Sequence, residues 1–340
     1  EVLTKKKYNN AYIAHIVADE PNGPRGDTTR SKCLSNNINN LMLLCDEHHR
    51  LIDKVEVDSH PESRLLEMKK KHEDRIMRQT SISPNMLSDI ILYGANIGKQ
   101  NSPLSYQIAC EAIFPDFYPA NNDAIELGMK NTPFTDETDL YWSAEEENLD
   151  IQFNQKIKSQ LMLGNSFHYS IFALAPQPLL IKLGVLLNDI HNIRVYQKHR
   201  EPSTWKWQQL SANTTYSLLE PIDKKQIPVL VLSLSATITH DRIKKILGEK
   251  VSIWEITIDE PNNDFLQTEK ILSDFRKIVR RAFDLIKSHQ GCIDLHVFPA
   301  MPVSASMEFG RVWMPKADMP LVIYDENKSK GGFYKTITIN

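Results

Sequence analysis

The chain has 340 residues, of which 41% are hydrophobic and 24% are charged, and its formal net charge is −3. This length is too great for one ordinary core and predicts two or more domains, while the composition excludes a disordered or fibrous protein. The weak negative charge gives no overall attraction to phosphate, so any contact with nucleic acid must come from a local patch.

The cellular location is predicted from the cysteines and the apolar segments. The 4 cysteines are scattered along the chain, which argues against a disulfide framework and for a reducing compartment. No apolar run approaches the roughly 18 residues that a membrane span needs, and the charged start is not a signal peptide. We therefore expect a soluble cytoplasmic protein with no membrane partner.

The first eighty residues predict a small mixed domain. Residues 12–17 and 41–44 are expected to form strands, and residues 19–37 a long loop rich in proline and glycine. One helix is expected to begin near Asp46 and another at Pro61, since proline is favoured in the first helical turn.

The polar run that follows predicts a domain boundary. We place the first domain at residues 1–80, a linker at 81–88 and a second domain at 89–340.

Strand-like and helix-like segments alternate after the linker. Strands are expected at residues 90–97, 169–174, 193–197, 228–234, 252–258, 293–298 and 321–324. Helices are expected at residues 106–114, 178–187, 241–247, 271–286 and 304–313. This alternation predicts an α/β fold of parallel sheets covered by helices on both faces.

A faint internal duplication divides the second domain into halves at 89–215 and 216–340. In each half a buried strand runs into a proline and then into a helix that contains a glycine. The pairs are Pro176 with Gly184 and Pro302 with Gly310, eight residues apart in both halves. Two Rossmann-like halves would align their strand ends along one face, where open α/β sheets bind ligands.

Candidate catalytic residues lie in the first domain: His15, Asn40 and His49. Hydrolysis of a phosphodiester requires a base that takes a proton from water, and histidine is the side chain that titrates near neutral pH. It also requires a divalent cation, such as Mg²⁺, that polarises the phosphate, and a second histidine can ligate that cation. The pattern therefore favours a metal-dependent nuclease.

The combined pattern resembles the HNH endonuclease family over about residues 8–80. The matching residues are His15, the run Asn-Leu-Met-Leu-Leu-Cys from Asn40 to Cys45, and the run His-Arg-Leu-Ile-Asp from His49 to Asp53. The resemblance implies an α+β ββα-metal module in which His15 is the general base, Asn40 orients the His15 loop and His49 ligates the catalytic cation.

The residue before the first histidine departs from this family. Many members carry an acidic residue or a histidine there as a second metal ligand, whereas this chain has Ala14. Either fewer side chains hold the metal here, or Asp19 or another residue substitutes.

A second metal and two lysine runs are also predicted as features of this domain. Cys45 and His48 have the spacing of half a structural zinc site, which needs four ligands, and Cys33 is the only other cysteine nearby. In the resembling nucleases a cysteine pair lies upstream of the first strand, and we expect that pair to be missing from the residues given. The alternative is a buried Cys45 beside an exposed His48. The lysines at 5–7 and 69–71 are candidate phosphate contacts or, alternatively, solvated faces.

Three segments of the second domain resemble the SAVED sensor domain: residues 172–180, 199–207 and 298–306. With the first domain, the chain resembles the HNH–SAVED effector endonucleases of bacterial cyclic-oligonucleotide-based anti-phage signalling (CBASS) systems. This implies a SAVED domain of two fused CARF-like halves. It also implies cleavage of double-stranded DNA, switched on by a cyclic di- or trinucleotide. The expected assembly is a cytoplasmic bacterial homo-oligomer, a dimer that grows on activation.

A cyclic nucleotide offers phosphates, ribose hydroxyls and flat bases. Backbone amides and hydroxyls at strand ends suit the first two, arginine pairs with phosphate, and aromatic rings stack on bases. The candidate ligand-binding residues are Ser235, Thr237, Pro302, Ser304, Ser306, Arg200, Trp205, Trp207 and Phe298. The alternatives are core packing for the aromatic rings and helix capping for the serines.

Two other functions fit the sequence. One is a restriction-type HNH nuclease whose C-terminal domain reads DNA, although the net charge and the acidic stretch 136–150 argue against it. The other is a ligand-binding signalling protein whose HNH module is catalytically dead and only binds DNA, which Ala14 favours.

Overall fold

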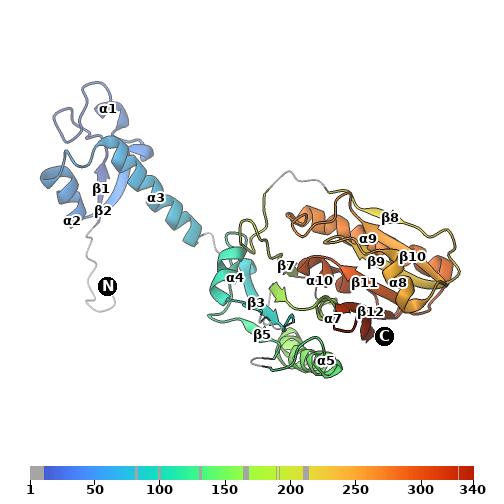
Figure 1. The fold of residues 1–340 in the computed structure, drawn as a ribbon. Coiled ribbons are helices and arrows are strands. Elements are labelled where there is room, and N and C mark those ends of the chain that lie inside the picture. The colour runs from blue at the N-terminus through green and yellow to red at the C-terminus, as the bar shows by residue number, and fades with distance from the viewer. Residues whose placement is uncertain are drawn as a thin grey trace. The chain divides into compact units, whose positions relative to one another are not determined.

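A computed structural model of the chain divides into two compact units, Glu1–Ile82 and Ser83–Asn340 (Figure 1). The structure describes residues 11–80, 83–98, 100, 102–129, 132–163, 168–188, 190, 192–209, 214–327 and 329–340. The lysines at 5–7, candidate phosphate contacts or a solvated face, lie outside the described residues. None of the described helices combines the length and the apolar character that crossing a bilayer requires.

The first unit is a β-hairpin followed by helices (blue in Figure 1). Strands β1 (Ala11–His15) and β2 (Leu41–Cys45) pair antiparallel. Helix α2 (Asp46–Arg50) follows β2 directly and continues into a π-helical turn, η2 (Leu51–Val55). Helix α3 (Glu62–Thr80) begins just after the proline that predicts it. The two expected strands and both expected helices are confirmed.

Side-chain alternation gives the hairpin one covered and one open face. The core under the covered face consists of Ile16, Ile52 and Leu65. On the open face Ile13 and Leu43 lie opposite each other, and each is 70% exposed. His15 lies two residues after Ile13 in β1, and side chains two residues apart in a strand point to the same face, so His15 is on the open face.

The long loop between the two strands begins with a tight turn that requires two glycines. A Cβ on Gly26 would lie 2.4 Å from a backbone carbonyl oxygen, and a Cβ on Gly23 would lie 2.6 Å from a neighbouring side chain. Between them Arg25 has a φ of 57°, in the left-handed region. The loop then forms the short helix α1 (Ser31–Leu34) and the 3₁₀ turn η1 (Ile38–Asn40).

The second unit contains two sheets, and the described strands of the first are all parallel. Strand β3 (Leu87–Gly94) pairs with β6 (Tyr169–Leu174), and β6 pairs with β7 (Ile193–Val195). On its other side β3 pairs with β4 (Tyr118–Pro119) and then with β5 (Ile125–Leu127). The helical segments of this half are η3 (Pro84–Met86), α4 (Tyr106–Ile113), α5 (Asp139–Phe153), η4 (Asn154–Lys158), α6 (Ser159–Leu163) and α7 (Gln177–Leu186).

The second sheet has the strand order β13-β12-β11-β9-β10-β8. Its strands are β8 (Ser217–Leu219), β9 (Ile227–Ser233), β10 (Val251–Thr257), β11 (Leu295–Ala300), β12 (Leu321–Asn327) and β13 (Gly332–Ile339). Its helices are α8 (His240–Leu247), α9 (Glu269–Gln290) and α10 (Val303–Val312). Strands β10, β9, β11 and β12 run parallel, as expected.

The expectation of purely parallel sheets is wrong at both edges of this second sheet. Strand β13 pairs antiparallel with β12, and β8 pairs antiparallel with β10. The connection from β12 to β13 is a short turn in which Gly331 and Gly332 have positive φ. A short turn can return the chain only antiparallel, because a parallel partner needs a long crossover.

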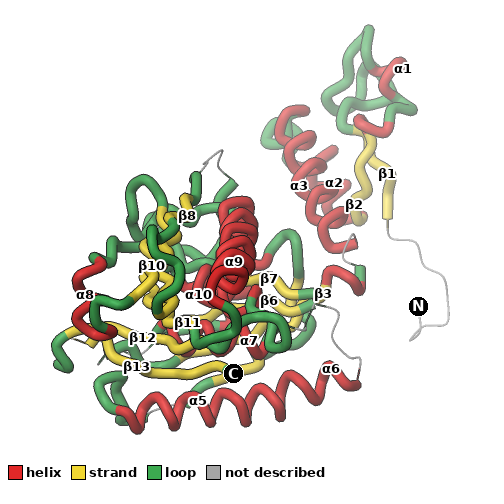
Figure 2. The backbone as a smooth tube through the Cα atoms, turned by 90° about the vertical axis from the view of Figure 1, so that its right-hand side faces the viewer, coloured by secondary structure: helices red, strands yellow, loops and turns green. Residues whose placement is uncertain are grey.

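Helices cover both faces of the second sheet (Figure 2). Leu230 and Leu232 of β9 join the large core that includes residues of α9 and α10. Their neighbours Val229 and Val231 point the other way and join a smaller core with Ile243 of α8. Burial on both faces explains why this strand is apolar throughout.

The two halves share a strand–helix arrangement. In the first sheet β6 lies between β3 and β7 and leads into α7, and in the second β11 lies between β9 and β12 and leads into α10. These two helices pack on each other at Gly184 and Gly310. A Cβ on Gly184 would lie 2.0 Å from the carbonyl oxygen of Met307, and a Cβ on Gly310 2.1 Å from that of Ile181.

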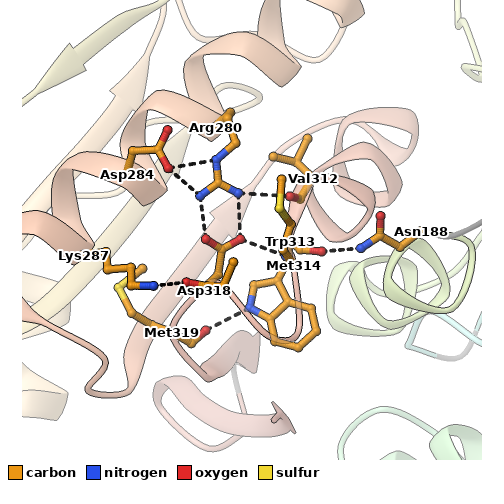
Figure 3. Close-up of polar contacts among 10 residues, drawn as sticks. Asn188, Arg280, Asp284, Lys287, Val312, Trp313, Met314, Asp318 and Met319 are labelled. Atoms are coloured by element: carbon orange, nitrogen blue, oxygen red, sulfur yellow. Dashed lines mark hydrogen bonds and ion pairs between the residues drawn. The ribbon is translucent and has the colours of Figure 1, made fainter.

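A polar cluster secures the chain that follows α10 (Figure 3). Arg280 of α9 donates two hydrogen bonds to the fully buried carboxylate of Asp318, at 2.5 and 2.8 Å. The indole of Trp313 donates to the carbonyl of Met319 at 2.8 Å. Asn188, just beyond α7, donates to the carbonyl of Trp313. A hydrogen bond thus joins the C-terminal ends of α7 and α10, in addition to their close packing at the two glycines.

Candidate functional site

His15 closes strand β1 with its imidazole held in one orientation. Its Nε2 lies 3.0 Å from the carbonyl oxygen of Ser35, which can only accept a hydrogen bond. Nε2 therefore carries the proton, and in the neutral ring Nδ1 has the free lone pair. A base with this geometry takes a proton at Nδ1.

Asn40 is buried at the end of η1, directly before β2. Its side-chain amide forms hydrogen bonds with the backbone around His15. Its Oδ1 accepts from the N–H of Val17 at 2.8 Å, and its Nδ2 donates to the carbonyl of Val17 at 2.9 Å. Nδ2 also lies 3.2 Å from the carbonyl of Leu34, the residue before Ser35. Asn40 therefore ties the chain after His15 to the segment whose carbonyl holds the imidazole.

His49 lies on α2 and contacts a carboxylate one turn later. Its Nε2 is 3.1 Å from Oδ2 of Asp53, and its ring stacks on Tyr12 of β1 with centroids 5.0 Å apart. The other oxygen of Asp53 accepts from Arg25 at 2.5 Å. No contact joins His49 to His15 directly in the described residues; Arg25 reaches both of their segments.

His49 and Asp53 have the spacing of two ligands of one divalent cation. Ligands at about 2.1 Å from an octahedral cation lie about 3.0 Å apart at right angles. The 3.1 Å between His49 Nε2 and Asp53 Oδ2 fits two such neighbours. Within the part of the chain that the structure describes, no group of three or more His, Cys, Asp or Glu side chains could hold a metal. The pair therefore fits an open site completed by water and phosphate oxygens.

Cys45 and His48 form a second exposed pair, with Sγ and Nδ1 3.0 Å apart. Hydrogen bonds from the backbone and the imidazole of His48 lower the pKa of the Cys45 thiol, and Cys45 in turn raises the pKa of His48. This pair would supply two of the four ligands that a structural zinc needs. Cys33 is exposed, and Cys45 is exposed where we had weighed a buried residue.

The expected phosphate contacts on α3 are partly engaged elsewhere. Lys69 donates to the carbonyl of Leu41 at 2.8 Å and pairs with Glu73, and Lys71 pairs with Glu67. These lysines are paired within their own unit.

In the second unit, two of the three expected ligand serines, Ser304 and Ser306, are buried. Ser304 donates its N–H and its hydroxyl to Oε1 of Gln197, at 3.1 and 2.7 Å. Gln177 accepts from the N–H of Met301 at 2.9 Å and from the hydroxyl of Ser306 at 3.5 Å. Two glutamines, which the sequence reasoning missed, thus satisfy the start of α10.

The other buried candidates are core residues. Phe298 is fully buried and stacks on Tyr324, and Trp205 packs edge-on against Phe172. Trp207 is buried and donates its indole N–H to the carbonyl of Val195. Pro302 is buried before α10. None of these aromatic rings presents an open face to a base.

Three candidates remain at the surface. Thr237 and Arg200 are exposed, and Ser235 is half-buried with its N–H bonded to the carbonyl of Ala300 at 2.7 Å. Ser235 and Thr237 lie just beyond the carboxyl end of β9, where open α/β sheets bind ligands.

A cavity of about 280 Å³ lies at the equivalent end of the first sheet. Gly94, Asn96, Ser102, Glu126 and Gly128 are among the residues that line it, beyond the carboxyl ends of β3 and β5. The sequence signal for it is the run Gly-Ala-Asn-Ile at residues 94–97, which ends the first strand of this half. The run Ser-Ala-Thr-Ile at residues 235–238 holds the same position in the second half.

Comparisons with known proteins bear on this second unit. A family model described as the SMODS-associated and fused to various effectors sensor domain (SAVED) matches residues 149–339. No curated protein matches the chain.

Solved structures also resemble the chain. The Acinetobacter baumannii Cap4 SAVED/CARF-domain containing receptor with the cyclic trinucleotide 2′3′3′-cAAA has 13% identity and a TM-score of 0.47. That alignment covers 81% of this chain and 56% of the receptor. The Moraxella osloensis receptor of the same description has 11% identity and a TM-score of 0.39, over 63% of this chain and 48% of its own.

The chain thus spans about half the length of these receptors. The match to the SAVED model covers more than half of the chain, and the chain therefore belongs to the SAVED family of sensor domains.

Proposed function

We propose that this chain is a nucleotide-activated DNA endonuclease of anti-phage defence. Its SAVED unit senses a cyclic di- or trinucleotide, and its HNH-like unit cleaves double-stranded DNA. The observation that carries the nuclease proposal is the fixed His15 imidazole, whose Nε2 is bonded to Ser35 while Nδ1 has no hydrogen bond among the described residues. The SAVED family membership carries the sensor proposal.

In the proposed reaction His15 is the general base. Water attacks the phosphorus as its proton passes to Nδ1 of His15, and the bond from phosphorus to the departing sugar oxygen breaks. That oxygen then takes a proton from solvent. Asn40 keeps the imidazole in the productive tautomer through the backbone that it bridges. His49 and Asp53 would hold a divalent cation, which supplies charge to stabilise the phosphate.

For the sensor, the accessible strand-end residues are the favoured ligand contacts. The hydroxyls of Ser235 and Thr237 suit ribose and phosphate oxygens, and Arg200 suits a phosphate. The other candidates are buried in the interior and offer no surface to a ligand: Ser304, Ser306, Pro302, Phe298, Trp205 and Trp207. Ligand binding that favours an assembled state of SAVED units would bring nuclease units together on one duplex. Sedimentation with and without ligand tests this, and activation without any change of assembly contradicts it.

The experiment that tests the function is plasmid cleavage with Mg²⁺ and a panel of cyclic di- and trinucleotides. The panel includes 2′3′3′-cAAA, the ligand named for the Acinetobacter receptor. We expect cleavage with one member, none without it, and none for His15→Ala. Cleavage that needs no nucleotide would favour a restriction-type nuclease.

The catalytically dead sensor is the second candidate, because Ala14 supplies no ligand and no third metal donor stands near His49 among the described residues. Nucleotide binding without cleavage by any tested metal would favour it.

A further inference from the structure

We infer that Arg25 is a positioning residue that fixes the segment of His15 relative to the helix of His49, an inference that rests on the proposed nuclease function. No sequence pattern singled Arg25 out. It lies in the loop between the strands, yet its side chain is only 9% exposed.

One edge of the guanidinium fixes the end of β1. Nε of Arg25 donates to the carbonyl of Ile16 at 2.7 Å, and Ile16 directly follows His15. The N–H of Ile16 is held in turn by the carbonyl of Asn40 at 2.8 Å. The residue after His15 is therefore bonded at both its N–H and its carbonyl.

The other edge fixes the helix that carries His49. Nη1 of Arg25 donates to the carbonyl of Ile52 at 3.2 Å, and Nη2 donates to Asp53 at 2.5 Å. The second oxygen of Asp53 faces Nε2 of His49 at 3.1 Å. Tyr12 stacks on the same imidazole with the planes 14° apart. The ring of His49 is thus fixed on its face and at its Nε2 edge.

Only arginine meets these requirements. Its planar fork presents several N–H donors in fixed directions, whereas lysine presents a compact charge on a flexible stem. The backbone also supports the placement, since Arg25 adopts a φ of 57° in a turn whose glycines admit no Cβ. Arg30 in the same loop differs, because its side chain is 50% exposed and its ion pair among the described residues is with Glu62.

One guanidinium therefore connects the strand of His15 with the helix of His49. A displacement of about 1 Å in a catalytic group can cost about 100-fold in rate. Loss of the guanidinium contacts is expected to lower turnover while substrate binding stays unchanged, because the side chain of Arg25 is buried.

The test compares Arg25→Lys with Arg30→Lys in the full chain. The first readout is plasmid cleavage with Mg²⁺ and the cyclic nucleotide panel. We expect Arg25→Lys to lower kcat at least about tenfold with KM within about twofold, and Arg30→Lys to change neither.

The second readout needs no activity. In ¹⁵N-histidine-labelled protein without added metal, NMR reports which ring nitrogen of each histidine bears the proton. We expect His49 to be protonated at Nε2 in the wild type and in Arg30→Lys, and to lose this preference in Arg25→Lys. Arg25→Gln, which removes the guanidinium and keeps a shorter amide donor, serves if Arg25→Lys does not fold.

The two proposals fail separately. A wild-type His49 spectrum in the folded Arg25 variant overturns the positioning role, whether or not the chain cleaves DNA. Altered His49 spectra in a chain that cleaves nothing leave Arg25 as the residue that orders this pocket and remove the nuclease function alone.

Discussion

The buried side-chain amide of Asn40 forms hydrogen bonds with two separate segments of the backbone. Its side chain makes hydrogen bonds to both backbone groups of Val17 and to the carbonyl of Leu34. Each buried backbone group left without a partner costs about 1–3 kcal/mol. The residue therefore stabilises the loop and orients the candidate base at once.

We predict that Asn40→Ala destabilises the first unit by about 3 kcal/mol, since it leaves a buried N–H and buried carbonyls unpaired. Hydrogen exchange measured by mass spectrometry should show faster exchange over residues 11–18 and 31–45. Asn39→Ala is the matched control, because Asn39 is exposed. Equal exchange in the two variants would contradict the role of Asn40.

Glu145 is the second residue with an unusual environment. It is fully buried on α5, and both carboxyl oxygens lack a hydrogen-bond partner among the described residues. Burial raises its pKa from 4.5 to about 7. The folded state therefore holds a proton on Glu145 more tightly than the unfolded chain does.

A raised folded-state pKa makes stability fall with rising pH. The contribution of Glu145 is fully present below pH 4.5 and is lost as the pH rises through about 7. We expect the urea midpoint of the second unit to drop between pH 5 and pH 8 in the wild type, and to drop less in Glu145→Gln, which stays neutral. Parallel curves for the two proteins would refute a proton on Glu145.

At the scale of elements, the crossing of α7 and α10 depends on two glycines. Helix propensity alone favours alanine over glycine by about 1 kcal/mol. At Gly184, however, the new methyl would lie 2.0 Å from a backbone oxygen of α10, which cannot move aside cheaply.

We predict that Gly184→Ala destabilises the second unit by about 3 kcal/mol, at the upper end of the usual cost of overpacking, despite its better helix propensity. Thermal unfolding followed by tryptophan fluorescence measures this, since every tryptophan lies in that unit. Ser143→Ala on exposed α5 surface is the control, with a change within about 0.5 kcal/mol. A stabilised Gly184→Ala would mean that the helices can separate.

Helix α5 is the element that sequence reasoning missed. Its buried residues are Tyr141, Trp142, Glu145, Leu149 and Phe153, so an acidic residue interrupts its apolar stripe. Leu140 and Ile151 of the same helix are exposed, which blurs the pattern further. Strand β8 was missed because it is a short edge strand whose partner, β10, lies more than thirty residues further along the chain. Strand β13, an edge strand of 8 residues beside β12, was also missed.

For the whole molecule, the cores predict independent units. The first unit is built on Ile16, Ile52 and Leu65, and none of these joins the clusters of the second. Separate cores allow separate cooperative unfolding.

We therefore expect residues 83–340, expressed alone, to unfold within about 3 °C of the corresponding transition of the full chain, because its hydrophobic core is complete without the first unit. Differential scanning calorimetry measures both transitions. A shift far larger than this would show that the first unit contributes to the core of the second.

The sequence alone determined the class of each element wherever a strong pattern existed, such as the hairpin, the amphipathic α9 and the strands buried on both faces. It also predicts phosphodiester chemistry, because the spacing of His15, Asn40 and His49 resembles that of the HNH family. These properties are local, so the residues themselves carry them.

Only the tertiary structure decided what each side chain contacts. It buried Phe298, Ser304 and Trp205, it brought Gln197 to the start of α10, and it placed Arg25 between two distant segments. Burial and hydrogen-bond partners depend on residues far apart in the chain. No local pattern of residues encodes them, and they emerge only when the elements pack.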